Sequence, residues 1–256
     1  MKLFDAHCHL QMKQFDTDRA EALARMEAAE VGGIVVGVDY ATSKQALEMA
    51  EQYDFLWAAV GLHPHDNLSE EFNETKYVEL GQNPKVVAIG ECGLDYSRGT
   101  SDAEKKTQQA RFEAQIEVAL TVLKPLIIHC RDAHDDMLEV LRDYMGNHPN
   151  LKVVIHFCTV TGELAKQYLD LGCYLSFPGP ITYTDMYDES IRLAPMERIL
   201  SETDSPFAAP APNRGKRNEP AYVGDVVKKI AAIKGVPEGD MAAKIVQNAR
   251  HVFNIA

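Results

Sequence analysis

Short hydrophobic runs recur along the whole chain, and most of them end in polar or ionisable residues. The runs cover residues 3–9, 34–38, 56–63, 86–91, 125–130, 153–158, 173–177 and 199–204. Segments with apolar residues at helical spacing lie between most of them, most clearly at 18–29, 103–123, 135–144 and 222–233. Eight strands alternating with helices over about 250 residues predict an α/β fold, a (β/α)8 TIM barrel, with an open doubly wound sheet as the second possibility.

Nothing in the sequence divides the chain into parts. We find no internal repeat, low-complexity tract or linker. We therefore expect a single domain over residues 1–256. The one conspicuous loop covers residues 206–220, whose prolines and glycine should resist helix and strand.

Composition narrows the class of protein. The chain of 256 residues is 46% hydrophobic, enough for a large core, and its formal net charge of -12 argues against broad binding to nucleic acid or anionic membrane, although a local basic patch stays possible. No apolar run approaches the ~18 residues that cross a bilayer. The first residues lack the basic-then-apolar pattern of a signal peptide. Five cysteines without a CxxC pair disfavour a disulfide framework. These features predict a soluble, cytoplasmic protein.

The first hydrophobic run, FDAHCHL, carries an unusual group of polar residues. In an extended strand Asp5, His7 and His9 would share one face, while Ala6 and Cys8 would share the other. On this stretch alone, a half-exposed strand with a polar face explains the pattern as well as a metal site does. The residues at the other strand ends are needed to distinguish a polar strand face from a metal site.

Ionisable residues also recur where the other runs end, in GLHPH, GECGLDY, IIHCRD, VIHFC and SETDSP. These motifs contribute His63, His65, Glu91, Asp95, His129, Arg131, His156 and Asp204. Such groups would be costly in a core, but in a barrel the carboxyl ends of the strands converge on the active site. Although a single histidine is most often structural, imidazoles and carboxylates recurring at one edge predict a metal centre.

The cysteines near these motifs are better explained by packing. Strand alternation puts Cys8, Cys92 and Cys130 on the face opposite the neighbouring ligand candidate, where small apolar residues pack against the outer helices. Cys158 shares the parity of His156, so alternation does not decide its role.

Taken together, FDAHCHL, GLHPH, GECGLDY, PLIIHCRDA, ETDSPF and RGKRNEPAY resemble the TatD family of metal-dependent deoxyribonucleases, within the amidohydrolase-like barrels. The resemblance runs nearly from end to end and implies a centre of two divalent ions. The ligands that it implies are His7, His9 and Asp204 for one ion, His129 and His156 for the second, and Glu91 as the bridge. Zinc, manganese and magnesium all fit histidine and carboxylate ligands.

The resemblance implies hydrolysis of DNA, as single strands or strand ends, with no membrane and no evident obligate protein partner. Two cations about 3.5 to 4 Å apart suit a phosphodiester because they can generate hydroxide, orient the phosphate and stabilise the leaving oxygen. Glu91 and Asp204 are the catalytic candidates. We expect Asp204 to orient the attacking water and accept its proton while also serving as a ligand; pure ligation is the alternative.

The expected substrate contacts are His63, His65, Arg131, Arg214 and Lys216. Guanidinium groups offer phosphate two parallel donors, whereas the alternative for these cations is ordinary surface charge. Asp5 could hydrogen-bond a ligand histidine. The segment HFCTVTG departs from the family pattern of His, one residue, Phe, Ser or Thr, Gly, so its substrate contacts do not carry over.

Two other functions fit part of the pattern. An amidohydrolase-like enzyme could cleave a C–N or carboxylic ester bond on the same scaffold, but such enzymes often bridge their metals with a carbamylated lysine, and the fourth run offers Glu91 instead. A non-catalytic nucleic-acid-binding protein with structural metals is the third possibility, disfavoured by the mixed ligand set. Phosphodiester turnover would separate it from a nuclease.

Overall fold

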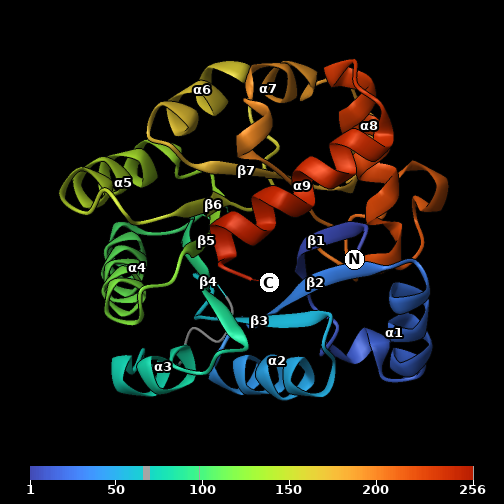
Figure 1. The fold of residues 1–256 in the computed structure, drawn as a ribbon. Helices are drawn as coiled ribbons and strands as arrows, with labels where there is room; N and C mark the ends of the chain where they lie inside the picture. Colours follow the sequence, from blue (N-terminus) through green and yellow to red (C-terminus); the bar gives the residue numbers. More distant parts are fainter. Residues whose placement is uncertain (66–69, 98, 256) are drawn as a thin grey trace.

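Eight parallel strands form a single sheet in the computed structural model, which describes residues 1–65, 70–97 and 99–255 (Figure 1). Each strand pairs with the next one along the chain. The strands are β1 (Leu3–Cys8), β2 (Val31–Val36), β3 (Leu56–Val60), β4 (Val86–Asp95), β5 (Leu126–Arg131), β6 (Val153–Ile155), β7 (Tyr174–Phe177) and β8 (Ile199–Ser201). The predicted TIM barrel is confirmed, and the open doubly wound sheet is wrong.

Helices surround the sheet (Figure 1). They are α1 (Arg19–Ala28), α2 (Tyr40–Gln52), α3 (Glu74–Gly81), α4 (Asp102–Val122), α5 (His134–Asn147), α6 (Gly162–Asp170), α7 (Asp188–Leu193), α8 (Val223–Lys234) and α9 (Glu238–Phe253). The four segments with the clearest helical spacing correspond to α1, α4, α5 and α8. The longest, α4, begins with a capping box: the side chain of Ser101 accepts from the backbone of Glu104, whose carboxylate accepts in return. With helices outside the barrel, β2 and β4 are buried along their whole length.

The first and last strands close the barrel through a buried aspartate. Asp5 is fully buried, and its carboxylate accepts from the backbone nitrogen of Thr203 at 2.8 Å and from the hydroxyl of Thr203 at 2.5 Å. Burial raises the pKa of Asp5 to about 8. A backbone bridge joins Cys8 to Ser205, and the amide of Asp204 donates to the carbonyl of His7 at 2.9 Å. The closure therefore sets Asp204 beside the first strand.

The last helix, α9, covers one end of the barrel (Figure 1). Phe253 stacks on Phe4, near the start of β1, with ring centroids 6.2 Å apart. The side-chain amide of Asn248 donates to the carbonyls of Met196 and Ile199, just before and at the start of β8. These contacts hold α9 against the amino ends of the strands and leave the carboxyl ends to the loops.

Some element boundaries differ from those that the sequence predicts. β4 runs on to Asp95 because residues 92–95 continue to pair with β5. β6 and β8 are shorter than their hydrophobic runs, so His156 and Asp204 lie just beyond the strands. Within the 206–220 loop, residues Ala211–Asn213 form a short 3-10 turn. Among the described residues, no helix is both long and apolar enough to cross a bilayer.

We predict that Gly93→Ala lowers the free energy of unfolding by about 3 kcal/mol or more. Gly93 has a φ of +138°, and an added Cβ would collide with the carbonyl oxygen of His129 on β5. Gly146→Ala is the matched control, because nothing lies near the added atom in α5, and it should stay within about 1 kcal/mol of wild type. Denaturant unfolding measures both; equal stability of the two variants would contradict this account of β4.

Candidate metal centre

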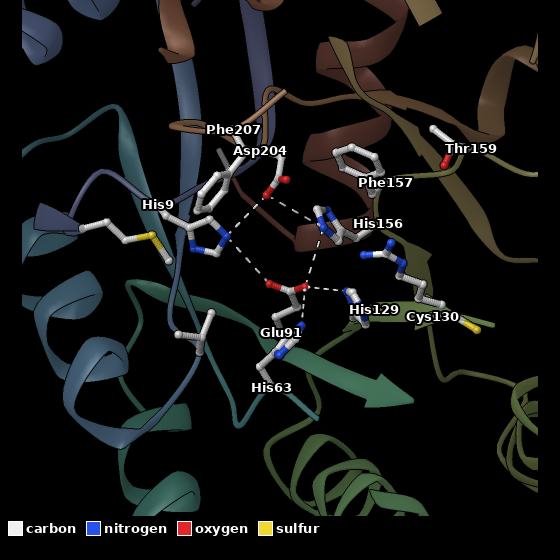
Figure 2. A pocket seen from close by; sticks show the side chains of 13 residues that line it. His9, His63, Glu91, His129, Cys130, His156, Phe157, Thr159, Asp204 and Phe207 are labelled. Carbon is white, nitrogen blue, oxygen red and sulfur yellow. Dashed lines mark ion pairs between the residues drawn. The ribbon is translucent and has the colours of Figure 1, made fainter. Parts of the chain in front are cut away.

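The six predicted ligands converge at the carboxyl end of the barrel, and Figure 2 shows five of them, all but His7, with Glu91 in the middle. Oε2 of Glu91 lies 3.3 Å from Nε2 of His7 and 3.7 Å from Nε2 of His9. Oε1 lies 3.0 Å from Nδ1 of His129 and 3.6 Å from Nε2 of His156. Oε1 also lies 3.5 Å from Nε2 of His63. The two oxygens of a single carboxylate therefore face two different sets of histidines, two on one side and three on the other.

Asp204 completes one side of this arrangement. Its Oδ1 lies 3.4 Å from Nε2 of His9 and 3.8 Å from Nε2 of His7, and these three side chains form a group whose ligand atoms lie within 4.8 Å of one another. A second such group contains His63, Glu91 and His129. Asp204 has a φ of +54°, in the left-handed region that aspartate tolerates better than most residues.

Most of the converging histidines are held through the ring nitrogen that points away from Glu91. Nδ1 of His9 lies 2.8 Å from the carbonyl of Val36. Nε2 of His129 lies 2.9 Å from Oδ2 of Asp95, and Nδ1 of His156 lies 2.9 Å from Oε1 of Glu202. Such partners fix the orientation of a ligating imidazole and raise its basicity.

The sequence analysis missed Glu202 and gave Asp95 no role. Glu202 lies in SETDSP, two residues before Asp204, and also joins His7 and His156 in a third group of possible ligands. Asp5 hydrogen-bonds a ligand histidine as expected, through the backbone amide of His7, which donates to Oδ1 at 3.2 Å. Within the described part of the chain, Nδ1 of His7 has no hydrogen-bond partner.

The electrostatics of the centre favour ionised carboxylates. Burial alone would raise the pKa of Glu91, but the surrounding histidines, chiefly His63, hold it well below its usual range. Burial would likewise raise the pKa of Asp204, yet His9 lowers it. Burial would lower the pKa of His129, but Asp95 and Glu91 raise it to about 9. Two ionised carboxylates among imidazoles are the donor set that divalent cations bind, so these residues fit such ions.

A cavity of about 550 Å³ is lined by five of the six converging residues, all but His7, and its size is within the range of small-molecule sites. His63 and Arg131, two of the expected substrate contacts, line it. His65 does not appear among the described residues that line it; its Nε2 lies 3.6 Å from Oδ1 of Asp95.

The basic segment after β8, residues 214–217, does not contribute to the described lining of this cavity. Arg214 and Lys216 are exposed, and neither is among the described residues that line the cavity. The guanidinium of Arg214 lies 4.2 Å from the ring centroid of Tyr183. Arg217, by contrast, is held by Asp18, with Nη2 2.7 Å from Oδ2. Substrate binding by Arg214 and Lys216 stays a prediction.

Cys8 and Cys92 lie where packing would place them, whereas Cys130 also lines the cavity. Cys8 and Cys92 are fully buried, and the thiol of Cys8 lies 3.2 Å from the carbonyl of Ile34. Sγ of Cys130 lies 3.3 Å from Nδ1 of His134 in α5, on the side of the outer helices. No cysteine of the described residues joins a group of possible metal ligands.

Comparisons with known proteins agree with the fold. The profile of the family described as TatD related DNase matches residues 4–254. The uncharacterized metal-dependent hydrolase YabD of Bacillus subtilis is 40% identical, over 99% of both chains. The 3'-5' ssDNA/RNA exonuclease TatD of Erwinia tasmaniensis is 35% identical over 99% of this chain and 100% of its own. The crystal structure of YJJV, a TatD homolog from Escherichia coli k12, superposes with a TM-score of 0.87 at 27% identity, covering 100% of this chain and 99% of that one.

We predict that Asp95→Asn lowers the pKa of His129 in the metal-free protein from about 9 toward the ordinary value of ~6.5. A histidine whose pKa is raised on folding contributes stability below its unfolded pKa, and this is lost as the pH rises through the folded value. The variant should therefore be less stable than wild type at pH 7. Titration of the histidine rings by NMR, with the surface variant Asp170→Asn as control, measures the shift. An unchanged pKa of His129 would show that Asp95 does not control it.

Proposed function

The chain belongs to the family of TatD-related DNases, and from that premise we propose that it is a phosphodiesterase that removes nucleotides from the 3' end of single-stranded DNA or RNA. Membership makes it a metal-dependent hydrolase. The finer assignment is supported by full-length relatives named as exonucleases of single-stranded DNA and RNA. Of these two nucleic acids, we expect DNA to be the substrate.

The position of Glu91 carries this proposal. Because its two oxygens face different sets of histidines, we propose that it bridges two divalent ions. One ion would be held by His7, His9 and Asp204, and the other by His129 and His156. When bound, such ions polarise a phosphodiester, lower the pKa of the attacking water and stabilise the leaving oxygen. Zinc, manganese and magnesium all suit these ligands.

The protein's own groups would orient the reacting atoms. The side chain of Asp204 is 14% exposed and lines the cavity, whereas that of Glu91 is only 4% exposed. Asp204 is ionised at neutral pH because His9 lowers its pKa, so its carboxylate can orient a water and accept its proton. His63 and Arg131 line the same cavity and would contact the phosphate. Asp95 and Glu202 would fix the imidazoles of His129 and His156.

We also propose a cytoplasmic location. All five cysteines are unpaired. Chains with free thiols suit a reducing compartment, where disulfides rarely form.

The direct test is an assay of the metal-stripped protein. It would be supplied in turn with zinc, manganese, magnesium or no ion, and each sample would be offered single-stranded DNA, duplex DNA and RNA carrying a label at the 5' end. We expect ion-dependent shortening of the single strands from the 3' end. No turnover with any ion, or only internal cuts, would contradict the proposed exonuclease.

We predict that Glu91→Gln removes most activity, more than about 100-fold, while leaving the fold intact. An amide keeps the size of the side chain but loses the charge that would bridge two cations. Glu163→Gln, an exposed change in the first turn of α6, is the control and should keep full activity. Turnover is measured after metal content and unfolding midpoint have been determined. Wild-type turnover by a fully metallated Gln variant would eliminate the bridging role.

We predict that replacing Arg214 and Lys216 together with alanine weakens binding to single-stranded DNA and flattens its salt dependence, by about 0.7 in logarithmic slope for each lost phosphate contact. Metal content should not change. Affinity is measured across a salt series with calcium as the non-supporting ion. Arg142→Ala with Lys166→Ala removes the same charge from α5 and α6 and serves as the control. If both pairs give the same slope as wild type, the basic segment does not contact the strand.

A further inference from the structure

Two phenylalanine rings stand at the cavity beside the centre, on either side of Asp204 (Figure 2). Phe207 is 47% exposed, and its ring centroid lies 6.4 Å from that of His9. Phe157 is half-buried, and its ring centroid lies 5.7 Å from that of His156. Both line the same cavity as Glu91 and Asp204. Aromatic side chains that line a cavity beside a few polar groups are typical of ligand sites.

The backbone holds both rings close to the candidate ligands. Phe157 has a φ of +48°, a left-handed conformation that bulky residues rarely adopt and that tends to occur at functional sites. Its N–H donates to Oε1 of Glu202 at 2.8 Å, and the same oxygen lies 2.9 Å from Nδ1 of His156. Glu202 thereby couples the position of the Phe157 ring to that of a candidate metal ligand.

Phe207 is fixed in a comparable way on the other side. Its N–H donates to the carbonyl of Asp204 at 2.9 Å, and its own carbonyl accepts from the side-chain amide of Asn218 at 2.7 Å. Asn218 is fully buried and also donates to the carbonyl of Thr203. The ring therefore stands on a rigid turn directly after Asp204.

We infer that Phe157 and Phe207 stack against the nucleobases on either side of the scissile phosphate, and that this stacking selects unpaired strands. The inference rests on the proposed function and adds the part of the substrate that the centre itself does not contact. Aromatic rings stack on every base, whatever the sequence, because each base has a flat π-face. A base can meet such a ring only when it leaves its own stack, which is easiest at a single-stranded end.

The geometry favours a nucleic acid over another apolar occupant. Each ring lies next to a histidine of the centre, so a group stacked on it would lie beside whatever the centre binds. Arg131, an exposed cation, lines the same cavity. A substrate that presents flat rings and phosphates in alternation matches rings, cation and metal ligands together, whereas a lipid or an apolar peptide matches only the rings.

The test compares two short DNA strands that are identical except that the last two nucleotides at the 3' end are abasic in one of them. Affinity is measured by fluorescence anisotropy in calcium for wild type, Phe157→Leu and Phe207→Leu. Phe72→Leu is the matched control, because Phe72 stacks on Tyr77, with ring centroids 4.7 Å apart, away from the residues that line the cavity. Each cavity variant should bind the base-bearing strand about 5- to 100-fold more weakly than wild type. The penalty should disappear on the abasic strand, and the control should show no penalty on either.

Two results would overturn the stacking. An equal loss on both strands would mean that the rings only support the centre, and no loss on either would mean that they do not touch the bases. Turnover in a supporting ion keeps this test separate from the proposed function. A wild-type protein that prefers the base-bearing strand but cleaves neither would contradict the exonuclease and leave the stacking supported. A wild-type protein that cleaves both strands equally, combined with cavity variants that bind and cleave like wild type, would support the exonuclease and contradict the stacking.

Discussion

The buried negative charge of Glu91 is the constraint on which the rest of the site depends. A carboxylate that is nearly inaccessible to water is costly unless positive groups or donors surround it. Here histidines surround it, and their partners Asp95 and Glu202 are themselves acidic. This accumulation of carboxylates is balanced by protons in the metal-free protein, and we propose that cations balance it in the working enzyme.

The barrel makes this arrangement possible because it brings distant parts of the chain to one edge. Glu91 belongs to β4, while its histidine neighbours lie in or just after β1, β3, β5 and β6. Asp204 reaches the first strand only because Asp5 and the bridge between Cys8 and Ser205 join the two edges of the sheet. The contacts that close the barrel between β1 and the segment after β8 therefore also position Asp204 in the site.

The hydrophobic pattern was sufficient to predict the barrel and the edge where the ionisable residues meet, because strands of one barrel end together. It did not reveal that β4 continues to Asp95, since that depends on pairing with β5. Glu202 was missed because its partner, His156, is far away in sequence. The left-handed backbone of Phe157 likewise accompanies a tertiary hydrogen bond to Glu202. Local sequence patterns do not predict such a contact.

The central claim is that Glu91 bridges two ions, and anomalous diffraction from crystals grown with manganese tests it most directly. The account predicts two peaks that both contact Glu91, one beside His7, His9 and Asp204 and the other beside His129 and His156. A single peak, or peaks that leave Glu91 without a metal contact, would contradict it.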